Sequence, residues 1–120
     1  MADYPESFDH MLAAWNEQDP ALVRGHLEKA LAQTIRFVDP SIDVTGIDGF
    51  EKNVHEVHAR IPGAEYIRTS GVDTQHRFYR YHWEIHLNGE LLIPGFDVAE
   101  TDEAGKIINM IGFFGPVPEK

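Results

Sequence analysis

The chain has 120 residues, of which 42% are hydrophobic and 11% aromatic, so we expect one folded domain spanning residues 1–120. The 20 acidic and 10 basic residues give a formal net charge of −10, which disfavours nucleic acid and anionic membranes as partners, because both bind clustered Lys and Arg. The absence of cysteine excludes disulfides and cysteine metal sites. Residues 1–6 lack the basic and apolar segments of a signal peptide, and no apolar run could cross a bilayer, so we expect a cytoplasmic protein.

Helical patterns dominate the first half of the chain. The first predicted helix has an apolar face at positions i, i+3, i+4 and i+7, made of Phe8, Met11, Leu12 and Trp15. Asp19-Pro20 is typical of a helix start, and the stripe of the second helix consists of Val23, Leu27, Ala30 and Leu31. Residues 48–51 resemble a capping box, with Asp48 as cap and Glu51 reaching back, and they begin a third helix that ends at Ile61-Pro62-Gly63.

Strand patterns dominate the second half. The segment 34–38 is rich in β-branched and aromatic residues and predicts a strand that Asp39-Pro40 ends. From residue 64 the period changes to two, and strands are predicted at 64–72, 76–87, 90–101 and 106–114. Asn88-Gly89 predicts a two-residue hairpin. Helices followed by antiparallel strands indicate an α+β domain, in which three helices cover one face of a curved sheet and a cavity opens between them.

Two aspartates occupy positions where a charge is unfavourable. Asp39 ends the apolar strand at 34–38, and Asp97 interrupts the apolar run at 91–99. If both face one cavity, burial would raise the pKa of Asp97 and make it a neutral donor, while Asp39 at the strand end would stay ionised and act as a base. The alternative is structural: Asp39 would start an Asx-type turn before Pro40, and Asp97 would accept a hydrogen bond from a nearby donor.

Histidines offer two further candidate sites. Zinc or iron could bind side chains that alternate along one side of the strand at 76–87, namely His82, Glu84 and His86, with His76 as a further ligand. The opposite side carries Tyr81, Trp83 and Ile85, so we expect the histidines to face solvent or a dimer partner and predict no metal. On the third helix, His55 and His58 lie three residues apart and could form a metal pair. Alternatively, His58 would point into the cavity or be satisfied by one hydrogen bond at the core edge.

The aromatic residues would suit a pocket for a flat, apolar ligand. The residues expected to line it are Trp15, Phe37, Val54, His58, Tyr79, Tyr81, Trp83, Ile93, Met110 and Phe114. The alternative is that these side chains fill an ordinary core.

Five segments occur in a characteristic order: Phe37-Val38-Asp39-Pro40, Gly46, Asn88-Gly89, Phe96-Asp97-Val98 and residues 102–107. Together they resemble the nuclear transport factor 2-like superfamily, and most closely its branch of ketosteroid isomerases and SnoaL-like polyketide cyclases. The resemblance covers almost the whole chain. It implies a cone-shaped α+β barrel, with three helices packed on a strongly curved, mixed and mostly antiparallel sheet that encloses a pocket. It also implies a homodimer formed through the outer face of the sheet.

The resemblance further implies roles for the two aspartates. In isomerase relatives, an aspartate before a proline removes a proton next to a ketone, and Asp39 matches that position. A protonated aspartate after the Asn-Gly hairpin stabilises the dienolate oxygen, and Asp97 matches it. The family's oxyanion tyrosine on the first helix has no counterpart in residues 10–15, and Asn53-Val54-His55 lacks the supporting tyrosine of the third helix. The oxyanion hole would therefore lack donors.

Three functions remain open from the sequence. The first is a cofactor-independent isomerase or cyclase that moves a proton next to the carbonyl of a small apolar or cyclic compound, with Asp39 as base and Asp97 as acid or oxyanion donor. His58 and Tyr81 would orient the reacting groups. The second is a non-catalytic ligand-binding module with the same pocket. The third is a protein-interaction module that uses the outer sheet face, with a filled interior.

Overall fold

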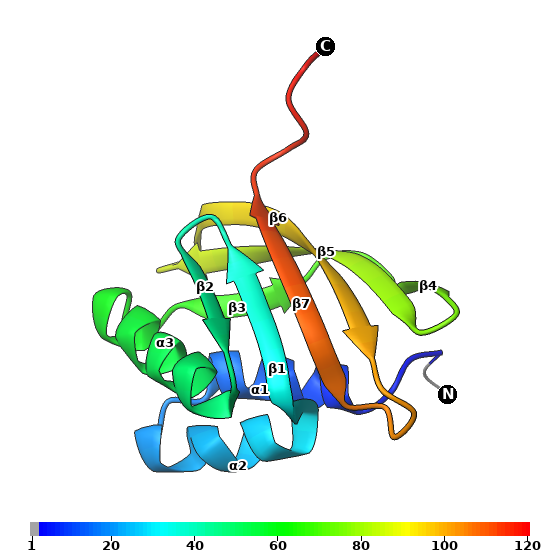
Figure 1. Ribbon diagram of the computed structural model, residues 1–120. Helices are drawn as coiled ribbons and strands as arrows, with labels where there is room; N and C mark the ends of the chain where they lie inside the picture. The colour runs from blue at the N-terminus through cyan, green and yellow to red at the C-terminus, as the bar shows by residue number, and fades with distance from the viewer. Residues whose placement is uncertain (1–2) are drawn as a thin grey trace.

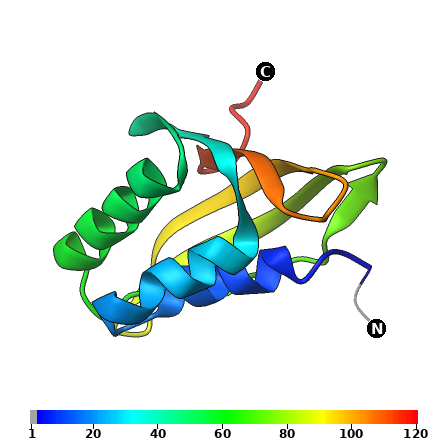
Figure 2. The same ribbon diagram turned by 60° about the horizontal axis from the view of Figure 1, so that its bottom comes forward.

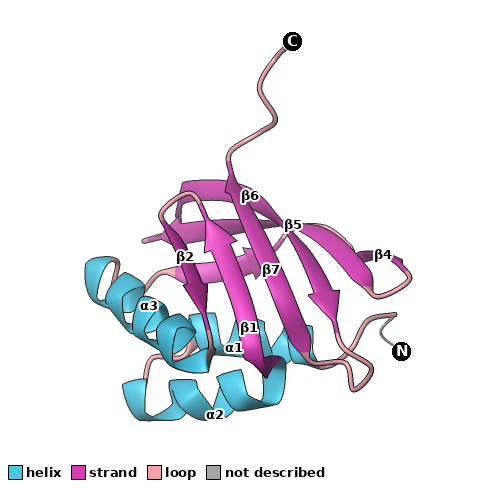
Figure 3. Cartoon of the chain, in the orientation of Figure 1, coloured by secondary structure: helices cyan, strands magenta, loops and turns pink. Residues whose placement is uncertain are grey.

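The computed structural model describes residues 3–120; Met1 and Ala2, which begin the N-terminal segment considered above, lie outside the described residues. Within residues 3–120 the chain forms three helices and seven strands (Figure 1). In chain order they are α1 (Ser7–Asn16), α2 (Pro20–Ala30), β1 (Leu31–Asp39), β2 (Ile42–Thr45), α3 (Ile47–Arg60), β3 (Glu65–Arg68), β4 (Asp73–Gln75), β5 (Phe78–Leu87), β6 (Glu90–Thr101) and β7 (Ile107–Phe114). Figure 3 shows the helices on one side of the sheet, so the predicted α+β class is confirmed.

The strands form one open sheet in the order β2-β1-β7-β6-β5-β3, with β4 paired to β5. β1 and β7 run parallel, whereas the other paired strands are antiparallel. Figure 2 shows the sheet arching over α1 and α2, while α3 lies beside β1 and β2. The predicted mixed, mostly antiparallel and curved sheet is confirmed, and its cone stays open because β2 and β3 are edges that do not pair with each other.

Local sequence explains how two of the elements begin. Asp19 caps α2, because its carboxylate accepts the backbone N–H of Ala21 at 2.9 Å and Pro20 fills the first helical position, as predicted. Asn88 and Gly89 have φ angles of 54° and 79° between β5 and β6, which is the left-handed conformation that a tight hairpin needs. The predicted hairpin is therefore confirmed.

The predicted capping box of α3 is wrong. The helix begins at Ile47, and its N-cap is Gly46, whose φ of 93° favours glycine. Asp48 therefore lies inside the first turn, where its side chain makes no cap bond and pairs with Arg24 at 2.5 Å instead. Glu51 also bonds Arg24, at 3.1 Å, so both acidic side chains tie α3 to α2.

Several strands differ from the predictions, and β1 begins at Leu31, which was expected in the second helix, rather than at residue 34. The predicted strand 76–87 is interrupted at His76, whose φ is 52°, so the chain turns there and 73–75 pairs back onto β5 as β4. The predicted strand 64–72 is limited to 65–68. β2, at 42–45, was not predicted, because four residues after a turn carry too short an alternation to identify.

The packed core occupies the closed end of the molecule, where the helices meet the sheet. Its largest fully buried side chains come from every layer and include Phe8, Leu27, Ile35, Phe50, Val54 and Met110. Toward the other end the concave face of the sheet is not filled by the helices. No helix within residues 3–120 has the length and apolar character needed to cross a bilayer.

Gly95 on β6 provides a test of how the sheet packs. A Cβ added there would collide with the Phe113 carbonyl oxygen and with the indole ring of Trp83. We expect Gly95→Ala to lower the free energy of unfolding by about 2 kcal/mol, because a ring and a backbone strand must both move. Gly25→Ala on α2 is the matched control: its Cβ would meet nothing within 4 Å, so stability should rise by about 0.5–1 kcal/mol. Urea unfolding measures both variants, and a Gly95→Ala protein as stable as wild type would contradict this packing.

Candidate active site

Four residues on four adjacent strands form one row across the concave face. In the strand register, Tyr81 on β5 pairs with Asp97 on β6, which pairs with Gly112 on β7. On β1, Val38 pairs with Ile111 of β7. The next residue, Asp39, therefore lies beside Gly112. A Cβ on Gly112 would lie 3.1 Å from Asp97 Oδ1 and 3.5 Å from the Cβ of Asp39. The two carboxyl side chains thus flank a position that has no side chain.

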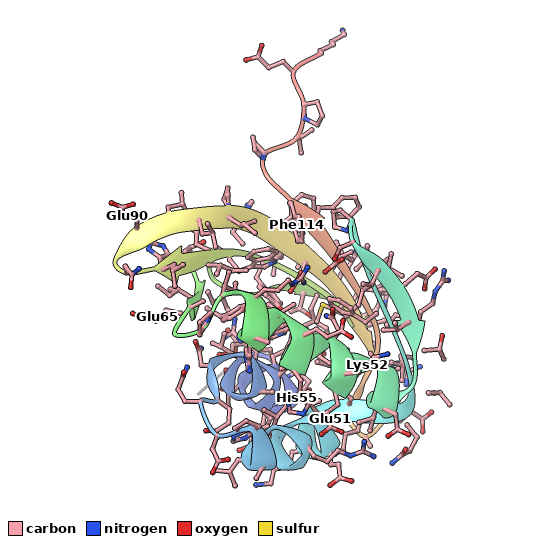
Figure 4. The ribbon with its side chains drawn as sticks, turned by 90° about the vertical axis from the view of Figure 1, so that its left-hand side faces the viewer. Glu51, Lys52, His55, Glu65, Glu90 and Phe114 are labelled. Atoms are coloured by element: carbon pink, nitrogen blue, oxygen red, sulfur yellow. The ribbon has the colours of Figure 1, made fainter. Side chains whose placement is uncertain are left out.

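The row faces a cavity of about 360 Å³. This volume is within the usual range of small-molecule sites, roughly 300–1,000 Å³. Asp39 and Asp97 both line it, and α1 contributes an apolar wall of Phe8, Met11, Leu12 and Trp15. Near the rim, Leu92 and Phe114 also line the cavity and remain partly exposed to solvent. Figure 4 shows Phe114 at the end of β7, beyond α3.

Two side chains hold the Asp97 carboxyl group. Tyr81 Oη donates to Oδ2 at 2.9 Å, and Trp83 Nε1 donates to Oδ1 at 2.8 Å. The pKa of Asp97 is raised from 3.8 to about 6, mainly because burial penalises the charged form and to a lesser extent because of the nearby charge of Asp39. The bonds from Trp83 and Tyr81 oppose this rise. Asp97 therefore changes its protonation state close to neutral pH, which suits a group that transfers protons.

Asp39 is held differently. Its Oδ1 accepts hydrogen bonds from Ser41 N at 2.8 Å, Ser41 Oγ at 2.7 Å and Ile42 N at 3.1 Å. This is the Asx-type turn that the sequence offered as a structural role. Among residues 3–120 no group donates to Oδ2, and the side chain lines the cavity as well. The turn fixes the carboxyl group by one oxygen, and the other is available to a ligand.

Six of the ten predicted pocket residues line the cavity: Trp15, Phe37, Tyr81, Trp83, Ile93 and Phe114. The aromatic members contact one another at its wall. The Trp83 and Phe114 rings meet edge to face at 5.9 Å, and those of Trp15 and Phe37 are tilted at 6.5 Å.

The other four predicted pocket residues lie elsewhere. Val54 and Met110 are fully buried in the core at the closed end, and Tyr79 packs against Phe8 with ring centroids 4.8 Å apart. His58 Nε2 bonds the carbonyl oxygen of Trp15 at 2.7 Å and lies outside the cavity lining, as the core-edge alternative expected. The periodicity of apolar residues shows which face of an element points inward. It does not show whether a residue on that face lies in the packed core or at the cavity.

The outward histidines of β5 make local contacts. His86 Nε2 lies 2.7 Å from Glu84 Oε1, and the His82 ring meets Phe96 at 6.1 Å. Within the described residues, no three His, Asp or Glu side chains are grouped closely enough to hold a metal ion.

The sequence missed three polar residues that line the cavity: Arg60, Tyr66 and Arg68. Tyr66 stacks on Trp15 with ring centroids 5.0 Å apart, and its hydroxyl is buried without a partner in the described structure. Arg68 lies between the rings of Tyr4 and Tyr81, 5.0 and 5.2 Å from their centroids. The alternation of residues 65–68 places Tyr66 and Arg68 on one face of the strand. An arginine on the inward face of a strand is the sequence feature that could have indicated these cavity residues.

Comparison with known proteins supports the fold and its family. No family model matches the sequence, and no curated protein matches it. Among solved structures, the chain is similar to a candidate isomerase of the SnoaL-like family from Agrobacterium tumefaciens, with 28% identity, a TM-score of 0.86, and 92% of this chain and 95% of that chain covered. It is also similar to a nuclear transport factor 2-like protein of unknown function from Exiguobacterium, with 16% identity, a TM-score of 0.75 and coverage of 92% and 99%.

A third likeness is to a candidate SnoaL-like polyketide cyclase from Jannaschia, with 14% identity, a TM-score of 0.69 and coverage of 91% and 85%. The helices, open mixed sheet and concave cavity define a cone-shaped α+β protein. The chain therefore has the nuclear transport factor 2-like fold, and at 28% identity it is similar to a protein of the SnoaL-like family. The resemblance seen in the sequence is confirmed.

The raised pKa of Asp97 predicts a pH-dependent stability. The folded state holds the Asp97 proton more tightly than the unfolded state, so this proton stabilises the fold fully below pH 3.8. The stabilisation is lost as the pH rises through about 6. The loss is at most about 3 kcal/mol, at roughly 1.4 kcal/mol per pKa unit. Asp97→Asn cannot ionise, so its free energy of unfolding should rise relative to wild type by up to about 3 kcal/mol between pH 4 and pH 8.

Asp43→Asn is the control for this measurement. Its hydrogen bond with Arg36 lowers the pKa of Asp43, so the stability of this variant relative to wild type should change with pH in the opposite direction. Urea unfolding at both pH values gives the difference. A stability difference between Asp97→Asn and wild type that does not vary with pH would contradict the raised pKa.

Proposed function

We propose that the protein is a cofactor-independent isomerase or cyclase that moves a proton next to the carbonyl group of a small apolar, cyclic compound. The observation that carries this proposal is that Asp39 and Asp97 line one largely apolar cavity, on either side of Gly112. A binding module needs the cavity but not the acidic pair. A protein-interaction module needs neither, and its interior would be filled by the rings that here line the cavity wall.

Asp39 is the base in this proposal. The three bonds to Oδ1 fix the orientation of the carboxyl group, so Oδ2 can accept a proton from the carbon next to the carbonyl group. The electron pair of the broken C–H bond moves toward the carbonyl oxygen and gives an enolate. Returning the proton from Asp39 to another carbon completes an isomerisation, and attack of the enolate carbon on an electrophile within the substrate completes a cyclisation.

Asp97 is the acid or oxyanion donor. An apolar ligand that displaces water from the cavity raises the pKa of Asp97 above its value near 6, so the carboxyl group becomes protonated and donates to the enolate oxygen. Tyr81 positions it: burial raises the pKa of this phenol well above 10.0, so the phenol keeps its proton and remains a donor. When two nearby carboxyl groups share one proton, the protonated group acts as the acid and the other group acts as the base.

Exchange of the α-protons of 1-tetralone in deuterated water, followed by proton NMR, tests the proposal. We expect wild type to accelerate exchange and Asp39→Asn to lose about a hundredfold or more in rate, because a positioned base is removed. The value of kcat/KM should fall as the pH rises through about 6, because the free protein then loses the Asp97 proton.

Asp43→Asn, an exposed aspartate outside the cavity lining, is the matched control and should exchange like wild type. Equal rates in wild type and Asp39→Asn would remove Asp39 as the base. Binding of 1-tetralone without accelerated exchange in wild type would instead favour a ligand-binding module.

We also propose that the partner on the outer sheet face is a second copy of the chain. Phe96 pairs in register with Phe113, and their rings stack at 5.0 Å on the outer face, where Phe113 is 48% exposed. Along β5 the outward side chains run from Arg80 through His82 to Glu84. A two-fold axis near His82 would set Arg80 of each copy against Glu84 of the other, which is a self-complementary arrangement of charge around an apolar centre.

Phe113→Glu tests this dimer, because a charge at the apolar centre would be desolvated without a partner. We expect wild type to sediment as a dimer and Phe113→Glu as a monomer at micromolar concentration. Leu22→Glu is the control: Leu22 is 53% exposed on α2, away from the outer sheet face, and the variant should keep the wild-type mass. A monomeric wild type would overturn the proposal.

A further inference from the structure

The acidic row offers a ligand almost no hydrogen-bond donors. Tyr81 Oη and Trp83 Nε1 already donate to Asp97, and Ser41 Oγ already donates to Asp39. What remains for a ligand is carboxylate oxygen and, when Asp97 is protonated, a single O–H. A negatively charged group on the ligand would be repelled from this row.

Donors without partners lie at another part of the same cavity. Tyr66 lines the cavity from β3, and its hydroxyl is buried without a hydrogen-bond partner among the described residues. Buried polar groups in proteins are nearly always paired, so an orphaned hydroxyl at a cavity wall indicates that a ligand supplies the acceptor. Burial raises the pKa of Tyr66 above 10.0, so the hydroxyl keeps its proton and acts as a donor.

Arg60, at the end of α3, lines the cavity as well. Its charge acts to lower the pKa of Tyr66, against the larger rise caused by burial, and both side chains line the same cavity. Within residues 3–120, Arg60 forms no ion pair, whereas every other arginine does: Arg24, Arg36, Arg68, Arg77 and Arg80. Arg60 is exposed to solvent at the cavity, so its guanidinium is available to an anionic group of a ligand.

Arg68 lies nearer the acidic row than Tyr66 does, because its guanidinium is 5.2 Å from the ring of Tyr81. It lines the cavity from the same face of β3 as Tyr66, and its Nε is buried without a partner in the described structure. Its Nη1 donates to Tyr4 Oη at 3.0 Å and to Asp9 Oδ1 at 3.3 Å, so its charge is already paired with Asp9.

The register separates the donors from the acids. Tyr66 pairs with Ile85 and Asp97 pairs with Tyr81, which are four residues apart on β5, about 13 Å at the usual rise of a strand. Asp39 is more distant, since three strands lie between β1 and β3 in the sheet. A ligand of two fused rings with a charged end spans such a distance.

We propose that Arg60 and Tyr66 form a carboxylate-binding end of the cavity, and that the ligand is a flat, apolar carbonyl compound carrying a carboxylate. The ligand's carboxylate lies against Arg60 and Tyr66, and its reactive carbon lies at Asp39 and Asp97. This inference rests on the proposed function, because it names the substrate class for the same cavity. Repulsion by the acidic row and attraction by the donor end fix one orientation of the ligand.

Calorimetric titration with 2-naphthoate and its neutral isostere 2-naphthamide tests the proposal. We expect wild type to bind 2-naphthoate at least tenfold more tightly than 2-naphthamide. Arg60→Gln should lose about tenfold in affinity for 2-naphthoate and little for 2-naphthamide, because only the charged ligand uses the guanidinium. Tyr66→Phe should weaken 2-naphthoate by a similar factor, since the ring and its stacking on Trp15 are retained.

Arg77→Gln and Tyr79→Phe are the matched controls. Arg77 is an exposed arginine before β5 and Tyr79 packs against the core, and neither lines the cavity. Both variants should bind 2-naphthoate like wild type.

The outcomes separate this inference from the proposed function. If 2-naphthamide binds as tightly as 2-naphthoate, or if Arg60→Gln and Tyr66→Phe keep wild-type affinity, the carboxylate-binding end is overturned, and 1-tetralone exchange still decides the catalytic proposal. If the carboxylate preference holds while Asp39→Asn exchanges like wild type, the base assignment fails and the donor end stands. If neither naphthalene compound binds, the donor end is overturned.

Discussion

The site depends on one arrangement, an Asp97 carboxyl group that is taken out of water and held by two neutral donors. Tyr81 and Trp83 reach it from β5 because the register pairs Tyr81 with Asp97 and Trp83 with Gly95. Two glycines make the approach possible: Gly95 leaves room for the indole ring, and Gly112 leaves room between the carboxyl groups. A neutral donor satisfies a carboxylate without cancelling its charge, so burial and the neighbouring Asp39 can still raise its pKa.

The same sheet face serves stability at one end and chemistry at the other. Toward the closed end, inward side chains of the sheet such as Ile35, Ile107 and Met110 are fully buried in the core. Toward the open end, the sheet and residues of α1 and α3 together line a cavity.

The sequence predicted the fold class, most of the elements and the two aspartates, for identifiable reasons. Long apolar stripes and alternating strands depend only on local period, and Asp39 and Asp97 were conspicuous because each interrupts an apolar run. The depth of a residue along the cone is not a local property, so Val54, Tyr79 and Met110 were expected in the pocket but lie in the core. Arg60 and Tyr66 escaped notice because their position depends on how β3 pairs with β5 and where α3 ends.

The most direct test of this account is the ionisation of Asp97 itself, followed by carbon-13 NMR of aspartate carboxyl groups in labelled protein, with Asp97→Asn to assign the resonance. The account predicts a titration midpoint near 6 for Asp97. A midpoint near 3.8, the ordinary value, would show a carboxyl group that is not removed from water, and the division of roles between the two aspartates would lose its physical basis.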